Sequence, residues 1–214
     1  MQPDVDQEMT QIERLMWDVY EHVRDNGARI YEGGASVAEA LYLQELAHRT
    51  GVSRIAEIGF NVGFSSLAFL EGASDVTMVS FELDRRHAVE LAKEFVDERY
   101  PGRHELVIGN SLKTVSAYAE DNTDRFDLVF VDGGHEYEVA TADIHNASLI
   151  AKPNGLVVVD DLVPWYPWGV GPSQAWQEAV NNGLIEPVES YVDGKPVETI
   201  AEPGDRAWAM GRFR

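Results

Sequence analysis

The sequence predicts an α/β domain with one mainly parallel sheet and helices on both faces. Five apolar segments are expected to be strands, and a helical stretch follows each of them: 53–58, 76–81, 104–108, 126–131 and 155–160. This alternation indicates right-handed crossovers in a doubly wound sheet, with the ligand-facing loops at the carboxyl ends of the strands. The 214 residues, 44% of them hydrophobic, are enough for one such core and few for two. We therefore expect a single domain over 1–214.

The first part of the chain predicts two helices that precede the sheet. Apolar residues recur at helical spacing within 5–24, at Ile12, Leu15, Met16, Val19 and Val23. A second helix is expected over 36–48, with Ser36 as its N-cap. The two glycines between these helices, 33–34, indicate either a simple loop or a flexible cover over a ligand.

The last part of the chain predicts an antiparallel pair of strands at one edge of the sheet. The segments 184–192 and 206–213 have strand-like composition, and no helical pattern separates them. Asp193-Gly194 and Pro203-Gly204 are turn signals between the two segments. The chain is therefore expected to end on the sheet.

The link between the first strand and its helix carries the most informative motif. Over 54–66 the sequence is R-I-A-E-I-G-F-N-V-G-F-S-S, an apolar strand followed by a glycine turn. Gly59 lets the backbone turn and Gly63 lets it pass close to a ligand. The dinucleotide fingerprint needs a middle glycine, where Phe60 and Asn61 stand in this chain. The turn therefore suits a nucleoside cofactor without phosphates.

Acidic residues follow two further strands that are expected to be neighbours. Asp132 follows the fourth strand and begins the sequence D-G-G-H-E-Y, and Asp160 and Asp161 follow the fifth. Three carboxylates in one cleft would raise one another's pKa values unless a divalent cation neutralises them. The chain has no cysteine, and oxygen ligands suit Mg²⁺, Mn²⁺ or Ca²⁺. We predict a metal site, with Mg²⁺ first, at Asp132, Asp160 and Asp161; the alternative is that these residues cap a helix or begin a turn.

The glycine turn resembles the first motif of the class I S-adenosylmethionine-dependent methyltransferases, and the resemblance covers most of the chain. It implies a Rossmann-like sheet of seven strands that ends in the antiparallel hairpin, with helices of 1–50 covering the site and 51–214 forming the core. It implies that Glu82, at the end of the second strand, accepts both ribose hydroxyls of the cofactor; the alternative is a solvated carboxylate. Ser111 is also a candidate N-cap for a helix over 112–119. The other cofactor contacts that the resemblance implies are Gly34, Ser36, Glu57, Gly59, Phe60, Asn61, Gly63, Ser65, Leu83, Asn110, Ser111 and Asp132.

Later motifs resemble the metal-dependent small-molecule O-methyltransferases within that class. The D-G-x-H-x-Y pattern and the Asp-Asp pair are closer to the antibiotic-sugar branch than to the catechol and caffeoyl-CoA branch; the catechol type carries an Asp-Asn pair and a lysine base. The resemblance implies methyl transfer to a hydroxyl of a small molecule such as a natural product, a sugar or a phenol. A base near neutrality removes the hydroxyl proton, and His135 is the candidate, with Asp132 beside it. A structural or metal-binding role for His135 and a metal-independent transferase acting on oxygen or nitrogen stay open.

An aromatic loop follows the Asp160-Asp161 pair at the ligand end of the sheet. Its three aromatic residues are interleaved with proline and glycine, and they are Trp165, Tyr166 and Trp168. A loop this apolar is predicted to stack on the methyl acceptor. The alternative is that the rings pack on the core or form a subunit contact.

The composition limits the partners of the protein. A formal net charge of −20 disfavours nucleic acid and anionic membrane surfaces. No segment approaches the roughly 20 apolar residues that cross a bilayer, and the first residues lack a signal-peptide pattern, so we expect a cytoplasmic protein. A homodimer is an open alternative to a monomer. Two rival classes are an NAD-dependent oxidoreductase, which would share Glu82, and a cofactor-binding module without turnover.

Overall fold

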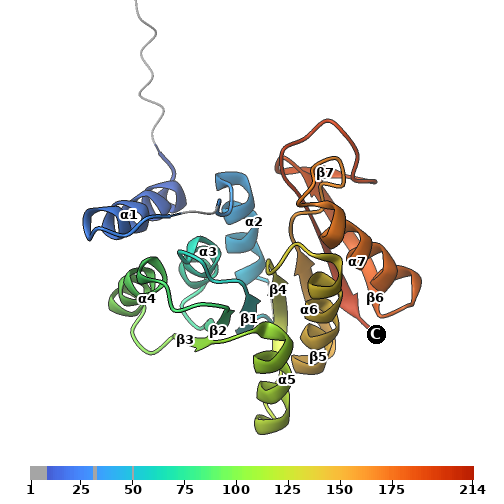
Figure 1. Cartoon of the computed structure of the whole chain (residues 1–214), viewed down its shortest axis with the longest axis horizontal. Coiled ribbons are helices and arrows are strands. Elements are labelled where there is room, and N and C mark those ends of the chain that lie inside the picture. The colour runs from blue at the N-terminus through green and yellow to red at the C-terminus, as the bar shows by residue number, and fades with distance from the viewer. Residues whose placement is uncertain (1–8, 31–32, 50) are drawn as a thin grey trace, which may run out of the picture.

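One mixed sheet forms the centre of the molecule. The computed structural model describes residues 9–30, 33–49 and 51–214, so residues 5–8 of the first predicted helix lie outside it. Within this described part, eight strands lie in the order β3-β2-β1-β4-β5-β8-β6-β7 (Figure 1). All five predicted central strands are present, and neighbouring strands among them run parallel. The strands are β1 (Arg54–Ile58), β2 (Thr77–Glu82), β3 (His104–Ile108), β4 (Phe126–Val131), β5 (Ala151–Val159), β6 (Ile185–Val192), β7 (Lys195–Val197) and β8 (Ala207–Phe213).

The helices follow the strands as the alternation predicts. The described helices are α1 (Gln11–Asp25), α2 (Val37–Ala47), α3 (Phe64–Gly72), α4 (His87–Arg99), α5 (Ser111–Asp121), α6 (Tyr137–Ile150) and α7 (Val170–Asn181). A capping box begins both α1 and α2, and Ser36 is confirmed as the N-cap of α2. The apolar residues predicted for the first helix are all buried. Within the described ranges, no helix has the length and apolarity that a membrane crossing requires.

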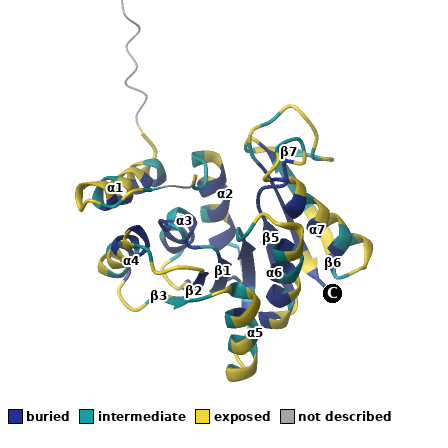
Figure 2. Cartoon of the chain, in the orientation of Figure 1, coloured by how far each residue is buried: buried dark blue, intermediate teal, exposed yellow. Residues whose placement is uncertain are grey.

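Different helices cover the two faces of the sheet. One buried cluster joins α1, α2, α3 and α4 to Ile55, Phe130 and Trp208 of the sheet. A second cluster joins α5, α6 and α7 to Ala56 and Val129 on the opposite face (Figure 2). Successive residues of β1 and β4 therefore point into different layers, as the pleat requires. Because both faces are buried, the central strands are almost continuously apolar.

The C-terminal strands extend the sheet antiparallel, as predicted. β8 pairs with β5 on one side and with β6 on the other. The described part of the sheet has one strand more than the expected seven, the three-residue β7, which pairs with β6. The turn between β6 and β7 is Asp193-Gly194, with φ values of 48° and 76°. Such a turn suits a tight hairpin, while three residues are too few to show an alternating pattern in the sequence.

Candidate active site

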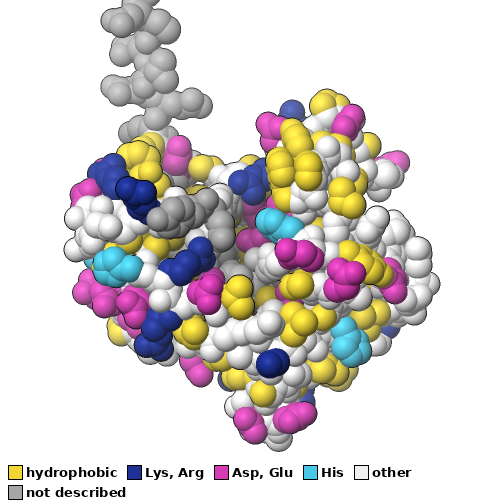
Figure 3. Space-filling model, in the orientation of Figure 1, with side chains coloured by type: hydrophobic (Ala, Val, Ile, Leu, Met, Phe, Trp, Pro, Cys, Tyr) yellow, Lys and Arg dark blue, Asp and Glu magenta, His cyan; other side chains and the backbone are white. Residues whose placement is uncertain are grey.

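A cavity of about 770 Å³ lies at the carboxyl ends of the parallel strands. Figure 3 shows a hollow on this face, with acidic, basic and histidine side chains around it. In a doubly wound sheet, ligands bind at this edge. The predicted site residues that line the cavity are Gly34, Gly59, Phe60, Asn61, Ser65, Glu82, Leu83, Asn110, Ser111, Asp132, His135, Asp161 and Trp168. The predicted residues that lie outside its wall are Ser36, Glu57, Gly63, Asp160, Trp165 and Tyr166.

Gly59 places the turn after β1 directly against the end of β4. Its φ is +98°, and a Cβ at this position would lie 1.9 Å from the carbonyl oxygen of Asp132. The N–H of Gly59 donates to the carbonyl of Phe81 at 2.8 Å, and the N–H of Asp132 donates to that of Ile58 at 2.9 Å. The ends of three adjacent strands are joined in this way. A residue with a side chain could not occupy this approach.

The later residues of the turn make contacts within the protein in addition to those that line the cavity. Gly63, the N-cap of α3, has a φ of 76°, and a Cβ there would lie 3.0 Å from the ring of Phe60. Gly63 therefore makes room for the ring of Phe60, whereas the sequence motif suggested that it lets the backbone pass close to a ligand. The side-chain amide of Asn61 donates to the carbonyl of Gly33 at 3.0 Å. Asn61 therefore ties the turn to the loop before α2.

Glu82 lies at the end of β2 with 6% of its surface exposed. Its Oε2 accepts from the backbone N–H of Asn61 at 2.8 Å and from that of Phe60 at 3.2 Å. Its Oε1 has longer contacts, 3.4 Å to the N–H of Asp84 and 3.5 Å to the guanidinium of Arg86. One oxygen is therefore fixed by the turn, while the other has the capacity to accept from a ligand hydroxyl.

Glu57 lies beneath the turn instead of at the cavity wall, where a cofactor contact was expected. Its carboxylate is fully buried and accepts from the hydroxyls of Ser65, Ser66 and Ser80. Burial raises the pKa of Glu57 to about 7, and the three hydrogen bonds oppose that rise. The side chain braces α3 against β1 and β2, and it reaches the cavity only through Ser65.

Leu83, Asn110 and Ser111 line the cavity from the ends of β2 and β3. Asn110 is the N-cap of α5, because its side-chain oxygen accepts from the N–H of Leu112 at 2.9 Å. The expectation that Ser111 caps this helix is therefore wrong. Asn110 keeps an extended backbone and Ser111 is already helical, so the capping geometry belongs to the asparagine.

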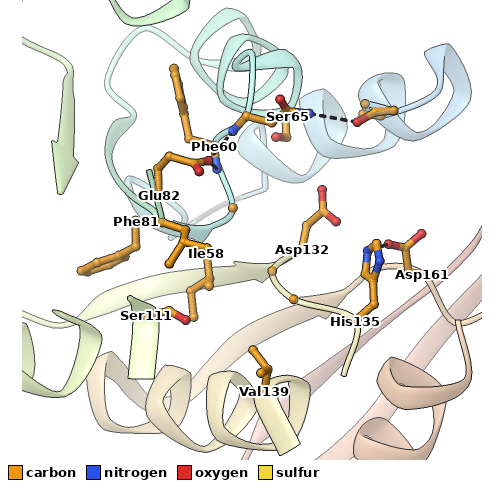
Figure 4. A pocket seen from close by; sticks show the side chains of 18 of the residues that line it. Ile58, Phe60, Ser65, Phe81, Glu82, Ser111, Asp132, His135, Val139 and Asp161 are labelled. Atoms are coloured by element: carbon orange, nitrogen blue, oxygen red, sulfur yellow. Dashed lines mark hydrogen bonds and ion pairs between the residues drawn. The ribbon is translucent and has the colours of Figure 1, made fainter. Parts of the chain in front are cut away.

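Asp132, His135 and Asp161 form a compact group on the other side of the cavity (Figure 4). One possible ligand atom from each residue lies within 4.8 Å of the others. Nε2 of His135 lies 2.8 Å from Oδ2 of Asp161, and this hydrogen bond raises the pKa of His135. Burial, followed by the charges of Asp160 and Asp161, raises the pKa of Asp132 well above its usual range. Oxygen and imidazole ligands at this spacing suit a divalent cation or a proton transfer.

Asp160 lies outside this group, so the group differs from the predicted metal set of Asp132, Asp160 and Asp161. β5 ends at Val159 and Asp161 has a left-handed backbone with a φ of 59°, so the alternation of a strand does not set the directions of these two side chains. Asp160 is 3% exposed and interacts with the fully buried Glu39 of α2. Burial, together with the charges of Glu39 and Asp161, raises the pKa of Asp160. The group that the structure brings together therefore contains His135 and leaves out Asp160.

The aromatic loop contributes one ring to the cavity. Trp168 lines the cavity, is 45% exposed and stacks on Tyr166 with ring centroids 4.5 Å apart and planes at 5°. The hydroxyl of Tyr166 donates to Asp205 at 2.9 Å, and the indole N–H of Trp165 donates to the carbonyl of Gly204 at 2.8 Å. Trp165 and Tyr166 therefore support the loop from behind the ring of Trp168.

Arg206 lines the cavity just before β8 and is not among the residues predicted from the sequence. Its guanidinium donates to the carbonyl of Gly34 at 3.1 Å and lies 4.0 Å from Oδ1 of Asp161. No local pattern marks this residue, because its position depends on β8 lying beside β5. The spatial order of the strands was needed to find it.

A doubly wound sheet with a cavity at the carboxyl ends of its strands, beside the first glycine turn, defines a protein with a Rossmann-like fold. The sequence profile of the family described as "Methyltransferase domain" matches residues 56–162, half of the chain. The chain belongs to this family.

Curated relatives and solved structures agree with that assignment. A protein of Mycobacterium ulcerans named "Putative O-methyltransferase" is 31% identical over 112 residues, which cover 51% of this chain and 48% of the relative. The match thus spans about half of that relative's length. An O-methyltransferase from Bacillus cereus in complex with SAH superimposes with a TM-score of 0.76 at 17% identity, covering 99% and 94% of the two chains. The O-methyltransferase TomG from Streptomyces achromogenes gives 0.72 at 19% identity, covering 96% and 91%. Both structures show that the fold is shared.

Proposed function

We propose that the protein is an S-adenosylmethionine-dependent O-methyltransferase that acts on a hydroxyl of a small molecule with the help of a divalent cation. The observation that carries this proposal is that Glu82 and the group of Asp132, His135 and Asp161 line one cavity on either side of Gly59. The family assignment, the names of the relatives, and the SAH and SAM bound in the Bacillus cereus and TomG structures support it.

The residues present fit the proposed cofactor. A carboxylate is a strong hydrogen-bond acceptor for ribose hydroxyls. Oε1 of Glu82, at the end of the second strand, has the capacity to accept from them. Phe60 and Asn61 fill the place where a dinucleotide needs a glycine, and Asn61 is fixed to Gly33. Ligand cavities typically measure ~300–1,000 Å³, so this one has room for a nucleoside cofactor and a small acceptor.

The donor set also fits a divalent cation. Asp132 and Asp161 would hold it beside His135, because their carboxylates offer the hard oxygen ligands that Mg²⁺ or Mn²⁺ accepts. Buried like charges raise the pKa of Asp132, and this repulsion is what a cation would relieve. A bound cation would orient the acceptor hydroxyl and lower its pKa.

Proton removal falls to His135 in this proposal. Because its Nε2 donates to Asp161, the neutral ring keeps a lone pair on Nδ1 for the acceptor proton. Asp161 then stabilises the imidazolium, which is consistent with the raised pKa of His135. Asp132 lies next to the turn at Gly59 and would orient the acceptor oxygen toward the cofactor.

The test begins with the cofactor. Calorimetry should show binding of S-adenosylhomocysteine, and a thermal shift with NAD alone would contradict the proposal and favour the oxidoreductase. A panel of phenols, sugars and amines should then release S-adenosylhomocysteine from S-adenosylmethionine, and a chelator should suppress the release. Activity that a chelator leaves unchanged would favour the metal-independent transferase. Cofactor binding with no release across the panel would favour the non-catalytic module.

We also propose that the protein acts in the cytoplasm on a small-molecule acceptor, without nucleic acid or membrane partners. The net charge of −20 supports this proposal, because it opposes association with polyanions. Light scattering of the purified chain would decide between a monomer and the homodimer that the sequence leaves open.

A further inference from the structure

We infer that the methyl acceptor is a planar aromatic hydroxy acid, whose ring stacks on Trp168 and whose carboxylate pairs with Arg206. This inference rests on the proposed function and names the substrate class of the same cavity. The two residues line the cavity together with Asp161 and His135. None of the roles proposed for cofactor, cation or proton transfer uses Trp168 or Arg206.

The guanidinium of Arg206 has donors to spare. Among the described residues, its one hydrogen bond goes to the neutral carbonyl of Gly34 at 3.1 Å. Its distance of 4.0 Å from Asp161 is a charge contact and is too long for a hydrogen bond. A guanidinium carries five N–H donors in a planar fork that matches a carboxylate. Its side chain is 35% exposed and faces a cavity whose other charged residues are mainly acidic.

Arg206 lies on the acceptor side of the cavity. The strand order places β8 beyond β5, whereas the glycine turn and Glu82 belong to β1 and β2 on the other side of β4. The N–H of Leu162, next to Asp161, donates to the carbonyl of Ala207, next to Arg206, at 2.8 Å. The guanidinium is therefore held beside the proposed reaction centre, on the side away from the ribose site.

The ring of Trp168 and the guanidinium of Arg206 share one rigid support. Asp205, which fixes Tyr166 behind the ring of Trp168, is the neighbour of Arg206 in the chain. The backbone N–H groups of Asp205 and Arg206 both donate to Asp193, at 2.9 and 3.0 Å. A flat apolar surface and a cation are thus preorganised on linked loops, and such an arrangement recognises a planar anion at low entropic cost.

Because the chain is strongly acidic, the positive charge of Arg206 in the cavity bears on whether an anionic acceptor can bind. A net charge of −20 repels an anionic acceptor, so binding one requires a local positive group in the cavity. The competing explanation is that Arg206 only neutralises Asp161 and ties down Gly34. That role would affect neutral and anionic acceptors alike, and the two explanations therefore differ in measurable selectivity.

Direct binding to protein saturated with S-adenosylhomocysteine tests the inference without turnover. The probes are 3-hydroxybenzoate, its amide 3-hydroxybenzamide, and the saturated 3-hydroxycyclohexanecarboxylate. We expect the benzoate to bind at least ~10-fold more tightly than the amide, because a charged hydrogen bond contributes roughly 1.5–3 kcal/mol. Arg206→Gln should abolish this preference and leave affinity for S-adenosylhomocysteine within ~2-fold. Arg212→Gln, which removes an exposed cation of β8, the strand that follows Arg206, should keep this preference.

The ring has its own comparison. Trp168→Ala should weaken the benzoate and the amide by roughly 2–10-fold more than the saturated acid, since only the planar rings lose aromatic stacking. The inference is overturned if the wild type does not prefer the benzoate, or if Arg206→Gln weakens acid and amide equally. Failure of the wild type to bind S-adenosylhomocysteine would instead overturn the proposed function.

Discussion

The backbone N–H of Asn61 donates to Oε2 of Glu82 at 2.8 Å, so the acid at the end of β2 holds the glycine turn of the neighbouring strand. Phe60 donates to the same oxygen at 3.2 Å. Glu82 therefore has two tasks: it fixes the turn through one oxygen and offers the other to the cavity. Any change to this residue should act on the shape of the cofactor site as well as on its hydrogen bonds.

Glu82→Ala is expected to lower the affinity for S-adenosylhomocysteine by at least ~10-fold, since each hydrogen bond to a charged acceptor contributes roughly 1.5–3 kcal/mol. Calorimetry with the purified variant measures the change. Glu105→Ala removes an exposed carboxylate from the adjacent strand β3 and is the matched control, with affinity unchanged. An affinity of Glu82→Ala equal to that of the wild type would remove this residue from the cofactor site.

Asp161→Asn is expected to slow methyl transfer by at least ~100-fold, because it weakens both proton removal by His135 and cation binding. Affinity for S-adenosylhomocysteine should stay within ~3-fold, since Asp161 lies away from Glu82. Asp160→Asn should have a smaller effect on the rate, because Asp160 faces Glu39. Initial rates of methyl transfer to an acceptor from the panel measure the effects of both substitutions. The reverse order of effects would restore Asp160 to the metal set and remove Asp161.

Much of the site could be predicted because the strand ends of a parallel sheet meet at one edge. Glu82, Asp132 and Asp161 each follow an apolar strand, so order in the sequence was enough to bring them to one cavity. Glu57 could not be placed in the same way. Both faces of β1 are buried, and no polar face distinguishes the direction of Glu57 from that of Ile58.

Two other differences have separate causes. The contact of Asp160 with Glu39 had no local signal, because β5 ends at Val159 and the left-handed backbone of Asp161 breaks the alternation of side chains. Arg206 also had no local signal. It hydrogen-bonds to Gly34, 172 positions away in the chain, and only the insertion of β8 between β5 and β6 brings the two together.

The stability of the protein should carry the signature of a buried neutral histidine. His104 lies in β3, its Nε2 is 2.9 Å from the hydroxyl of Ser80, and its ring stacks on Phe60 with centroids 5.1 Å apart. Burial, followed by the charge of Lys93, lowers the pKa of His104 from 6.5 to about 3. Between these values the unfolded chain binds the proton and the folded chain does not. The contribution of the neutral His104 to the free energy of unfolding is therefore complete above the unfolded pKa and is lost as the pH falls below that value.

His104→Gln removes this proton linkage. From pH 7.5 to pH 5, the free energy of unfolding of the variant should change relative to the wild type by about 2 kcal/mol in favour of the variant. Urea unfolding at the two pH values measures the difference. His145→Gln, at an exposed position on α6, should show no such relative change. Parallel pH profiles for His104→Gln and the wild type would mean that His104 titrates alike in the folded and unfolded states.

Gly59→Ala should lower the free energy of unfolding by far more than the strain of a left-handed backbone alone accounts for. The added Cβ would meet the carbonyl oxygen of Asp132 at 1.9 Å, so the ends of β1 and β4 must separate. We expect a loss of roughly 3 kcal/mol or more in the free energy of unfolding, from overpacking added to backbone strain. Gly102→Ala is the matched control, because Gly102 has a φ of +73° and nothing within 4 Å of an added Cβ. The free energy of unfolding of Gly102→Ala should fall by only ~1–2 kcal/mol, the cost of a left-handed conformation for a residue with a Cβ. Equal losses in urea unfolding would show that the contact with Asp132 does not constrain the turn.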